Sequence, residues 1–179
     1  IIMSNLLKDA SILLTPTAYD NGRMLAVKPE IALGEELVVN GDFATDLSGW
    51  DDSGGVTVLW DSGRAKLTTT ATGYIKPISA LTTVIGAKYR FLVTLTGTGN
   101  TANVRAGTTS LGFDLFNSGW GVTDGSHAYS FTATTTTTYI AVGNGSANVS
   151  YIDNVSVKED LSGDFTFSRN SAATRVNEQ

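Results

Sequence analysis

The chain has 179 residues, of which 41% are hydrophobic and 16% charged, so it can bury one core and is not a charged, disordered tail. Its formal net charge is −5 and it has no Lys/Arg cluster, which argues against nucleic acid and against an anionic membrane surface as partners. Cysteine is absent and His127 is the single histidine, so disulfides, thiolate sites and His-based metal sites are excluded. No apolar run approaches the roughly 20 residues of a membrane span.

Residues 1–35 are predicted to form an N-terminal arm. A Thr-Pro step at residues 15–16, an Asp-Asn-Gly turn at 20–22 and a Lys-Pro step at 28–29 interrupt regular structure. The segment is nevertheless too apolar for a solvated tail, so we expect it to anchor on another protein rather than to fray. The anchoring residues are predicted to be Leu6, Leu7, Ile12, Leu13, Leu14 and Tyr19.

Residues 36–158 carry many short strand candidates separated by turn signals. Residues 89–95 alternate, with Tyr89 and Phe91 on the same face, and in residues 151–157 the side chains of Tyr151 and Val155 share parity. The pattern predicts an all-β fold, an antiparallel two-sheet β-sandwich. The strands are expected at 36–40, 56–60, 64–70, 74–78, 88–95, 103–106, 111–116, 128–133, 138–142 and 149–157.

Residues 159–179 are predicted to be a linker and the start of a C-terminal segment. Glu159-Asp160 and Ser162-Gly163 have linker character, and residues 164–169 alternate again. We therefore expect the natural protein to continue beyond Gln179.

Catalytic motifs are missing from the sequence, which predicts a protein that is not an enzyme. There is no G-x-S-x-G elbow, no P-loop and no G-x-G-x-x-G that opens a helix. His127 is expected in a turn that enters a strand. Counting alone does not exclude a carboxylate pair, but most acidic residues fall in predicted turns, where they cap backbone groups.

Two stretches resemble the ends of a known class of domain. The stretch LVVNGDFATDLSGW at residues 37–50 resembles the opening of jelly-roll carbohydrate-binding modules, the class that contains families 4, 9 and 22. YIDNVSVK at residues 151–158 is similar to the closing strand of the same class. The resemblance implies a jelly-roll-like sandwich over residues 36–158 and a capacity to bind carbohydrate.

The outer segments resemble bacteriophage proteins. MSNLLKDASILLTPTAYD at residues 3–20 is similar to the start of phage virion proteins, which suggests Met3 as the true start, and FTFSRNSAATRVN at residues 165–177 resembles a junction in fibre and tail proteins. The resemblance implies a virion protein, assembled in the host cytoplasm, whose arm binds capsid, portal or tail proteins. By analogy with fibres it also suggests a homotrimer.

Sugar recognition needs flat aromatic faces with polar groups beside them. Trp120 lies between Gly119 and Gly121, an arrangement more typical of a binding loop than of a core, and is the first candidate. Tyr74, on a predicted strand, and Trp60, at the end of one, are weaker candidates. Trp50 is expected in the core.

The resemblance also implies a structural calcium ion, with Asp42 and Asp153 at the positions that supply oxygen ligands. The class has a glutamate directly after the phenylalanine, where this chain has Ala44. One carboxylate is thereby lost, although Asp46 could compensate. In the alternative interpretation the two aspartates cap turn and edge backbone groups. No other cofactor is expected.

Three functions follow from these patterns. The first is a non-enzymatic virion protein (fibre, tail appendage or capsid decoration) whose sandwich touches host surface polysaccharide. The second is the carbohydrate-binding module of a glycoside-active enzyme with a catalytic domain beyond this chain. The third is a structural spacer that has lost sugar binding.

Overall fold

The computed structural model describes residues 19–20, 23–24 and 32–162 of the chain. They belong to two units, one of which is the compact domain Ala32–Leu161. In the other, strands β1 (Tyr19–Asp20) and β2 (Arg23–Met24) form an antiparallel pair. Nothing in the described part is a helix of the length and apolar character that a membrane span requires.

The predicted anchoring residues of the arm lie almost entirely outside the described residues. Of Tyr19 only the backbone is described, and it pairs with Met24. Met3 and the predicted C-terminal segment from residue 163 also fall outside, so these remain predictions. The other anchoring residues outside the described part are Leu6, Leu7, Ile12, Leu13 and Leu14.

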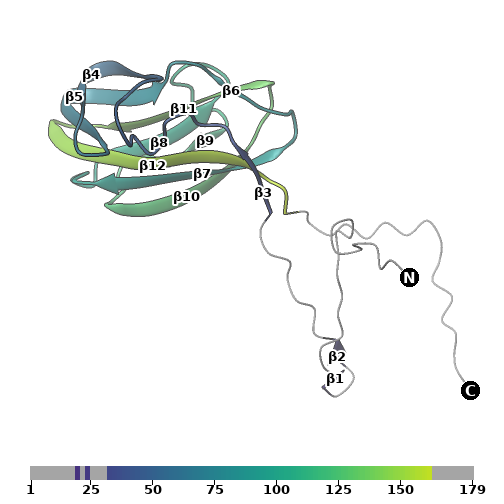
Figure 1. Cartoon of the computed structure of the whole chain (residues 1–179). Helices are drawn as coiled ribbons and strands as arrows, with labels where there is room; N and C mark the ends of the chain where they lie inside the picture. Colours follow the sequence, from purple (N-terminus) through teal and green to yellow (C-terminus); the bar gives the residue numbers. More distant parts are fainter. Residues whose placement is uncertain (1–18, 21–22, 25–31, 163–179) are drawn as a thin grey trace, which may run out of the picture. The chain divides into compact units, whose positions relative to one another are not determined.

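The compact domain is built from strands alone, which confirms the predicted all-β fold (Figure 1). The strands are β3 (Leu33–Glu36), β4 (Trp50–Trp60), β5 (Ala65–Pro77), β6 (Leu81–Thr82), β7 (Lys88–Thr96), β8 (Ala102–Gly107), β9 (Phe116–Asn117), β10 (Gly125–Thr132), β11 (Thr137–Asn144) and β12 (Asn148–Asp160).

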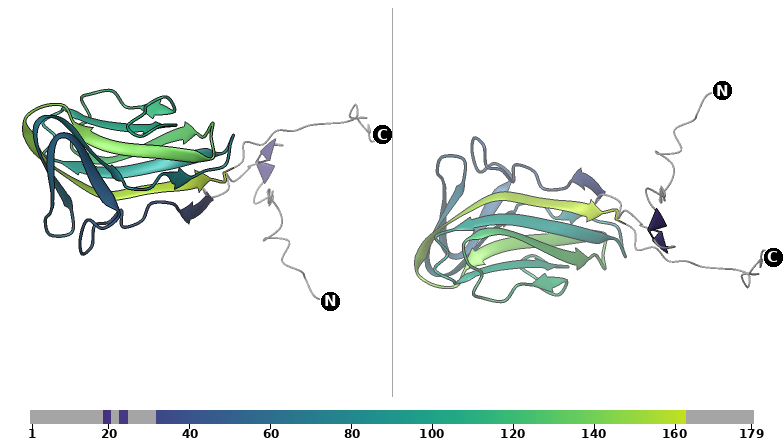
Figure 2. Two further views of the ribbon diagram at one scale, coloured as in Figure 1. Left: turned by 90° about the horizontal axis from the view of Figure 1, so that it is seen from above. Right: turned by 90° about the horizontal axis from the view of Figure 1, so that it is seen from below.

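These strands make a jelly-roll-like sandwich of two facing layers (Figures 1 and 2). The first layer has the order β10-β7-β12-β5, and the second continues as β5-β11-β8-β9. β5 belongs to both layers because its residues 65–69 pair with β12, whereas its residues 73–75 pair with β11. β4 follows β5 around this edge as its antiparallel partner. The sequence analysis predicts two strands here, but the structure has one long strand that bends between the layers.

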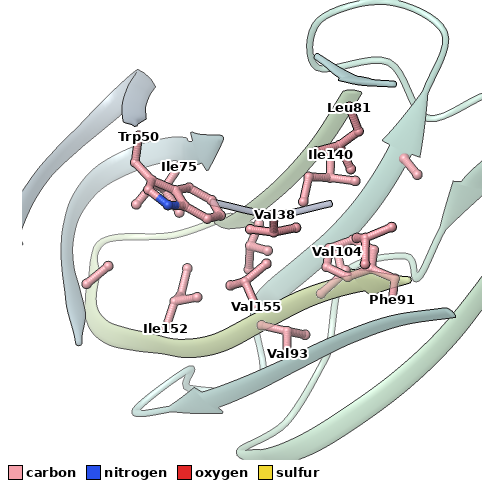
Figure 3. Packing of buried hydrophobic residues seen from close by; sticks show 14 of the residues in the cluster. Val38, Trp50, Ile75, Leu81, Phe91, Val93, Val104, Ile140, Ile152 and Val155 are labelled. Carbon is pink, nitrogen blue, oxygen red and sulfur yellow. The ribbon is translucent and has the colours of Figure 1, made fainter. Parts of the chain in front are cut away.

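Apolar side chains from both layers meet between them and form the core (Figure 3). Tyr89, Phe91, Val93 and Leu95 of β7 are all buried, which confirms the alternation predicted for this strand. From the second layer, β8 and β11 contribute side chains such as Val104 to the same cluster. The period-two pattern therefore assigns the correct residues to the core.

The parity predicted for β12 is wrong at one position. Tyr151 is only partly buried and lies under the Arg64 guanidinium, 4.3 Å from the ring centre, whereas Ile152 is 1% exposed and points into the core. The pairing of β12 with β7 shifts between Asp153 and Ser156, and Asn154 adopts a φ of 51°. This bulge inserts a residue and reverses which face the side chains occupy.

β3 pairs with the end of β12, so the chain enters and leaves the domain side by side (Figure 1). Leu33 lies opposite Asp160, and the N–H of Leu161 donates to the carbonyl of Ala32 at 2.9 Å. The strand predicted at residues 36–40 ends instead at Glu36, because the Glu36 carboxylate accepts the N–H of Val38 at 3.0 Å and draws the chain into a turn.

The strand predicted at residues 111–116 is mostly absent. Only Phe116–Asn117 pairs, with β8. Leu111 has a φ of 59°, in the left-handed region that breaks an extended strand. The segment between β8 and β10 instead crosses the outer face of the second layer, and this segment positions the candidate site.

Candidate functional site

Trp120, the first site residue predicted from the sequence, lies with its neighbours on the outer face of the second layer. Along β8, Val104 and Ala106 point into the core, so Asn103 and Arg105 point outward. On β5, Tyr74 lies on the same outer side, since Ile75 is the residue that enters the core. Asn103 is buried on this face because the segment between β8 and β10, which we call the covering segment, lies over it.

Trp120 is held on this face by backbone hydrogen bonds on both sides. The N–H groups of Gly121 and Ser118 donate to the carbonyls of Ala102 and Val104, at 3.2 and 2.9 Å. Gly119 and Gly121 have φ values of 72° and 110°, which only glycine adopts without strain. The two glycines that marked Trp120 in the sequence thus shape the loop that presents it.

The indole of Trp120 packs against a glycine and beside another aromatic ring. A Cβ atom added to Gly145 would lie 2.9 Å from Cε3 of the indole, so the ring rests directly on the Gly145 backbone. Its centre is 6.0 Å from that of Tyr74, and Trp120 remains 51% exposed. Beside it lies a hollow of about 290 Å³, lined by Thr72, Asn100, Thr101, Trp120, Gly121 and Gly145.

Tyr74 supports this arrangement from within. It is 6% exposed, and its ring occupies the place that a side chain at Gly143 would take. Burial raises the pKa of Tyr74 above its ordinary 10.0, while the nearby Arg105 guanidinium acts in the opposite direction. Tyr74 is therefore a neutral phenol at physiological pH. Because its ring is buried, it supports the face from below and does not offer an exposed surface to a ligand.

Arg105 extends the arrangement toward Phe113. Its guanidinium carbon lies 4.1 Å from the ring centre of Tyr74 and 5.5 Å from that of Phe113, which is 58% exposed. Nε donates to Oδ1 of Asn103 at 2.9 Å, Nη1 donates to the carbonyl of Leu111 at 3.1 Å, and Nη2 donates to the Tyr74 hydroxyl. We call the four side chains Trp120, Tyr74, Arg105 and Phe113 the outer-face row.

Asn103 ties the covering segment to the sheet. It is fully buried, and its Nδ2 donates to Oδ1 of Asn117 at 2.8 Å and to the carbonyl of Gly119 at 2.9 Å. A buried amide without such partners would be costly, so the covering segment and Asn103 depend on each other.

Sequence reasoning missed Arg105, Phe113 and Asn103. A signal was present for the two β8 residues, because a polar residue alternates with a small apolar one from Asn103 to Ala106 and this places both polar side chains on one face. Nothing in the sequence linked Phe113 to that face, since its position depends on the path of an irregular segment.

The other two tryptophans lie away from this face, and their indole N–H groups bind the opening loop. Trp50 is 8% exposed and its indole N–H donates to the carbonyls of Val39 and Asn40, so its predicted core position is confirmed. Trp60 is 44% exposed, but its indole N–H donates to the Phe43 carbonyl at 2.7 Å, which fastens the opening loop to the end of β4. The structure does not bring Trp60 into the outer-face row.

The calcium ion that the resemblance implies remains a prediction. No group of three or more acidic or histidine side chains that could hold a metal ion occurs among the described residues. Asp42 and Asp153 each accept a hydrogen bond from a nearby backbone N–H, of Ala44 at 3.4 Å and of Asn154 at 2.7 Å. These contacts fit the capping interpretation, and the calcium site has no supporting observation.

His127 is placed in the wall of the sandwich and not beside a nucleophile. Its Nε2 lies 2.8 Å from the Thr123 carbonyl, and its ring stacks on Tyr129 with centres 6.0 Å apart. The hydroxyl of the adjacent Ser126 pairs with that of Thr94 at 3.0 Å. The described residues therefore show no hydrogen bond between Ser126 and His127.

Comparison with known proteins gives a fold and no family. No protein-family model and no curated protein matches the sequence. Among solved structures, a CBM4 module has 16% identity and a TM-score of 0.50, over 68% of this chain and 99% of that chain. The ligand-free CBM1 module of BiXyn10A has 13% identity and a TM-score of 0.53, over 70% of this chain and 97% of that chain. The domain therefore has the fold of these jelly-roll modules.

A phage protein has a similar fold. The enzymatically active domain of tailspike protein 4 from bacteriophage CBA120 is 16% identical, with a TM-score of 0.53 over 69% of this chain. The match spans only 21% of that tailspike chain. At this identity the likeness concerns the fold of the shared part.

Proposed function

We propose that the domain Ala32–Leu161 binds carbohydrate without catalysing a reaction, and that it does so at the outer-face row. One observation carries the proposal: the half-exposed indole of Trp120 lies on Gly145 beside a hollow lined by Asn100 and Thr101. A flat aromatic face next to polar side chains suits a pyranose ring, which has an apolar face and polar edges. The likeness to carbohydrate-binding modules supports the same conclusion.

We further propose that the domain is carried by a bacteriophage virion, on a head or tail fibre or as a decoration. Support comes from the fold shared with a part of the phage tailspike and from the resemblance of residues 3–20 and 165–177 to virion proteins. The arm then binds capsid, portal or tail proteins, and the domain faces host surface polysaccharide. Many copies on one particle, for example as trimers, would raise a weak single-site affinity by about 10²–10⁴.

The second candidate is a module of a glycoside-active enzyme whose catalytic domain lies outside this chain. It is supported by the near-complete coverage of isolated carbohydrate-binding modules, 99% and 97% of their length. Particles purified on a density gradient and probed with an antibody to the domain separate the two candidates. Co-purification with the particle supports the virion role, and recovery only as a secreted protein supports the enzyme module.

The binding site is tested with the full chain and its Trp120→Ala variant against immobilised host-surface and plant polysaccharides. We expect saturable binding that weakens at least about tenfold in the variant, because a stacked ring contributes on the order of 1.4 kcal/mol. Ile85→Ala is the matched control, since Ile85 is an exposed apolar residue in a turn outside the row. Saturable binding of equal affinity in wild type and Trp120→Ala would contradict the outer-face row as the binding site. No binding to any polysaccharide would leave the spacer function.

A further inference from the structure

The Arg105 guanidinium is a fixed cation for which the described residues provide no anion. Three of its nitrogens already donate, to Asn103, Leu111 and Tyr74, and two rings stack on it. No described carboxylate forms an ion pair with Arg105, in contrast to Lys76–Asp51 at 2.8 Å and Lys158–Glu36 at 4.0 Å. In a chain with a net charge of −5, Arg105 thus places a positive charge without an ion-pair partner in the middle of the outer-face row.

Asp114, on the segment that follows β8, forms no ion pair with Arg105 and instead holds a local turn. Asp114 accepts the N–H and the hydroxyl of Thr108, at 2.9 and 2.8 Å. Asp51 of β4 is paired with Lys76 of β5, so its charge is neutralised by a residue other than Arg105. The direct partners of Arg105 are neutral acceptors and the faces of Tyr74 and Phe113, which stabilise a cation without cancelling its charge.

Arg105 and Tyr74 retain hydrogen-bond donors that have no acceptor among the described residues. A guanidinium has five N–H groups, so two remain after the three bonds it makes. The Tyr74 hydroxyl accepts from Nη2, and its own proton has no acceptor among the described residues. The acceptors beside them are occupied: Oδ1 of Asn103 by Arg105 and Oδ1 of Asn117 by Asn103. A ligand here must supply acceptor atoms and preferably a negative charge.

We propose that the outer-face row selects acidic glycans, with Arg105 binding the carboxylate of a uronic acid residue while Trp120 stacks on a neighbouring sugar ring. The planar guanidinium matches the two oxygens of a carboxylate, and charge-assisted hydrogen bonds are about twice as strong as neutral ones. This inference rests on the proposed function and specifies its ligand class.

The test uses the full chain with polygalacturonate, alginate and hyaluronan, each paired with its own carboxyl-reduced, neutral product. We expect at least tenfold tighter binding to the native member of one or more pairs, and an affinity that falls as salt is added. A sulfated but uronate-free polymer, dextran sulfate, separates carboxylate recognition from general attraction to anions. Stronger binding to dextran sulfate than to every uronate polymer overturns the proposal.

Variants assign the effect to Arg105. Arg105→Gln is expected to abolish the preference for the native polymer, and Arg105→Lys, which keeps the charge but loses the planar fork, to keep only part of it. Trp120→Ala should weaken binding to both members of a pair, and Ile85→Ala should change neither. If Arg105→Gln does not fold, the comparison of native and reduced polymers with the wild type still decides.

The two proposals fail in different ways. Equal affinity for native and carboxyl-reduced polymers, or binding to neutral polysaccharides alone, overturns the acidic-glycan inference while the domain remains a carbohydrate-binding protein. Absence of binding to acidic and neutral polysaccharides alike overturns the proposed function and the inference together.

Discussion

The carboxylate of Asp124 fixes the turn that follows β7. It accepts the N–H groups of Gly97 and Thr98 at 2.9 and 2.8 Å, and the Thr98 hydroxyl at 2.9 Å. Hydrogen bonds from the Thr98 backbone, then from Gly97, lower the pKa of Asp124 below its usual 3.8. A lowered native pKa means that the ionised form is favoured by folding.

Asp124→Asn should remove this contribution. The stabilisation by Asp124 is fully present above the unfolded pKa, near 3.8, and is lost as the pH falls through the lower native pKa. We therefore expect the variant to unfold at a lower urea concentration than wild type at pH 7, and the gap between the two midpoints to narrow below pH 3.8. A gap that is unchanged between pH 7 and pH 2.5 would contradict the assignment.

Single residues differ in how well their roles could be predicted. Trp120 was found because its flanking glycines are a local signal, and Trp50 because it belongs to the opening motif. The sequence shows that Arg105 is charged, but not which residues it contacts. Its role depends on Tyr74 and Phe113, which are 31 and 8 positions away in the sequence (105 − 74 and 113 − 105). Contacts between an irregular segment and a sheet face leave no periodic trace.

At the scale of the element, β12 depends on one residue with an unusual backbone conformation. Asn154 has a φ of 51° within the bulge that separates Asp153 from Ser156. Asparagine and glycine tolerate this region, whereas a β-branched side chain does not. The bulge lets Ile152 and Val155, three positions apart, both enter the core.

Asn154→Val is expected to destabilise the domain by about 1–2 kcal/mol, because it forces a β-branched residue into the left-handed region. Asn154→Gly, the matched variant, should stay within about 1 kcal/mol of wild type. Urea unfolding followed by tryptophan fluorescence measures both. Equal stability of the valine and glycine variants would show that the bulge can be lost without cost.

Elements with a regular pattern were predicted well and irregular ones were not. The alternation of β7 identified the correct core residues. β12 was predicted with the wrong parity before its bulge, since a period-two pattern cannot show an inserted residue. β4 and β5 are longer than predicted because glycines such as Gly54 and Gly73, usual turn signals, lie here within paired strands at the bend between the layers.

For the whole molecule, the decisive feature is that two layers share one core. Phe91 is fully buried in that core, and the next residue, Leu92, points to the outside of the first layer. Phe91→Ala should therefore cost about 3–5 kcal/mol, a large part of the 5–15 kcal/mol typical of a domain.

Leu92→Ala is the matched control for Phe91→Ala and should cost about 1 kcal/mol or less. The free energy of unfolding in urea measures both variants. Similar losses for the two neighbours would contradict the layered arrangement. The core-facing side and the outward-facing side of β7 would then contribute equally to stability.

The pairing of β3 with the end of β12 determines how the domain responds to a pull on its ends. Ala32 and Leu161 are hydrogen-bonded neighbours, so the points where the chain enters and leaves the domain lie together. Tension that separates these two residues would break the β3–β12 hydrogen bonds one after another. β3 would therefore be the first strand to leave the sheet. The outer-face row involves neither strand, so this surface would keep its shape under a load that has already separated β3 from β12.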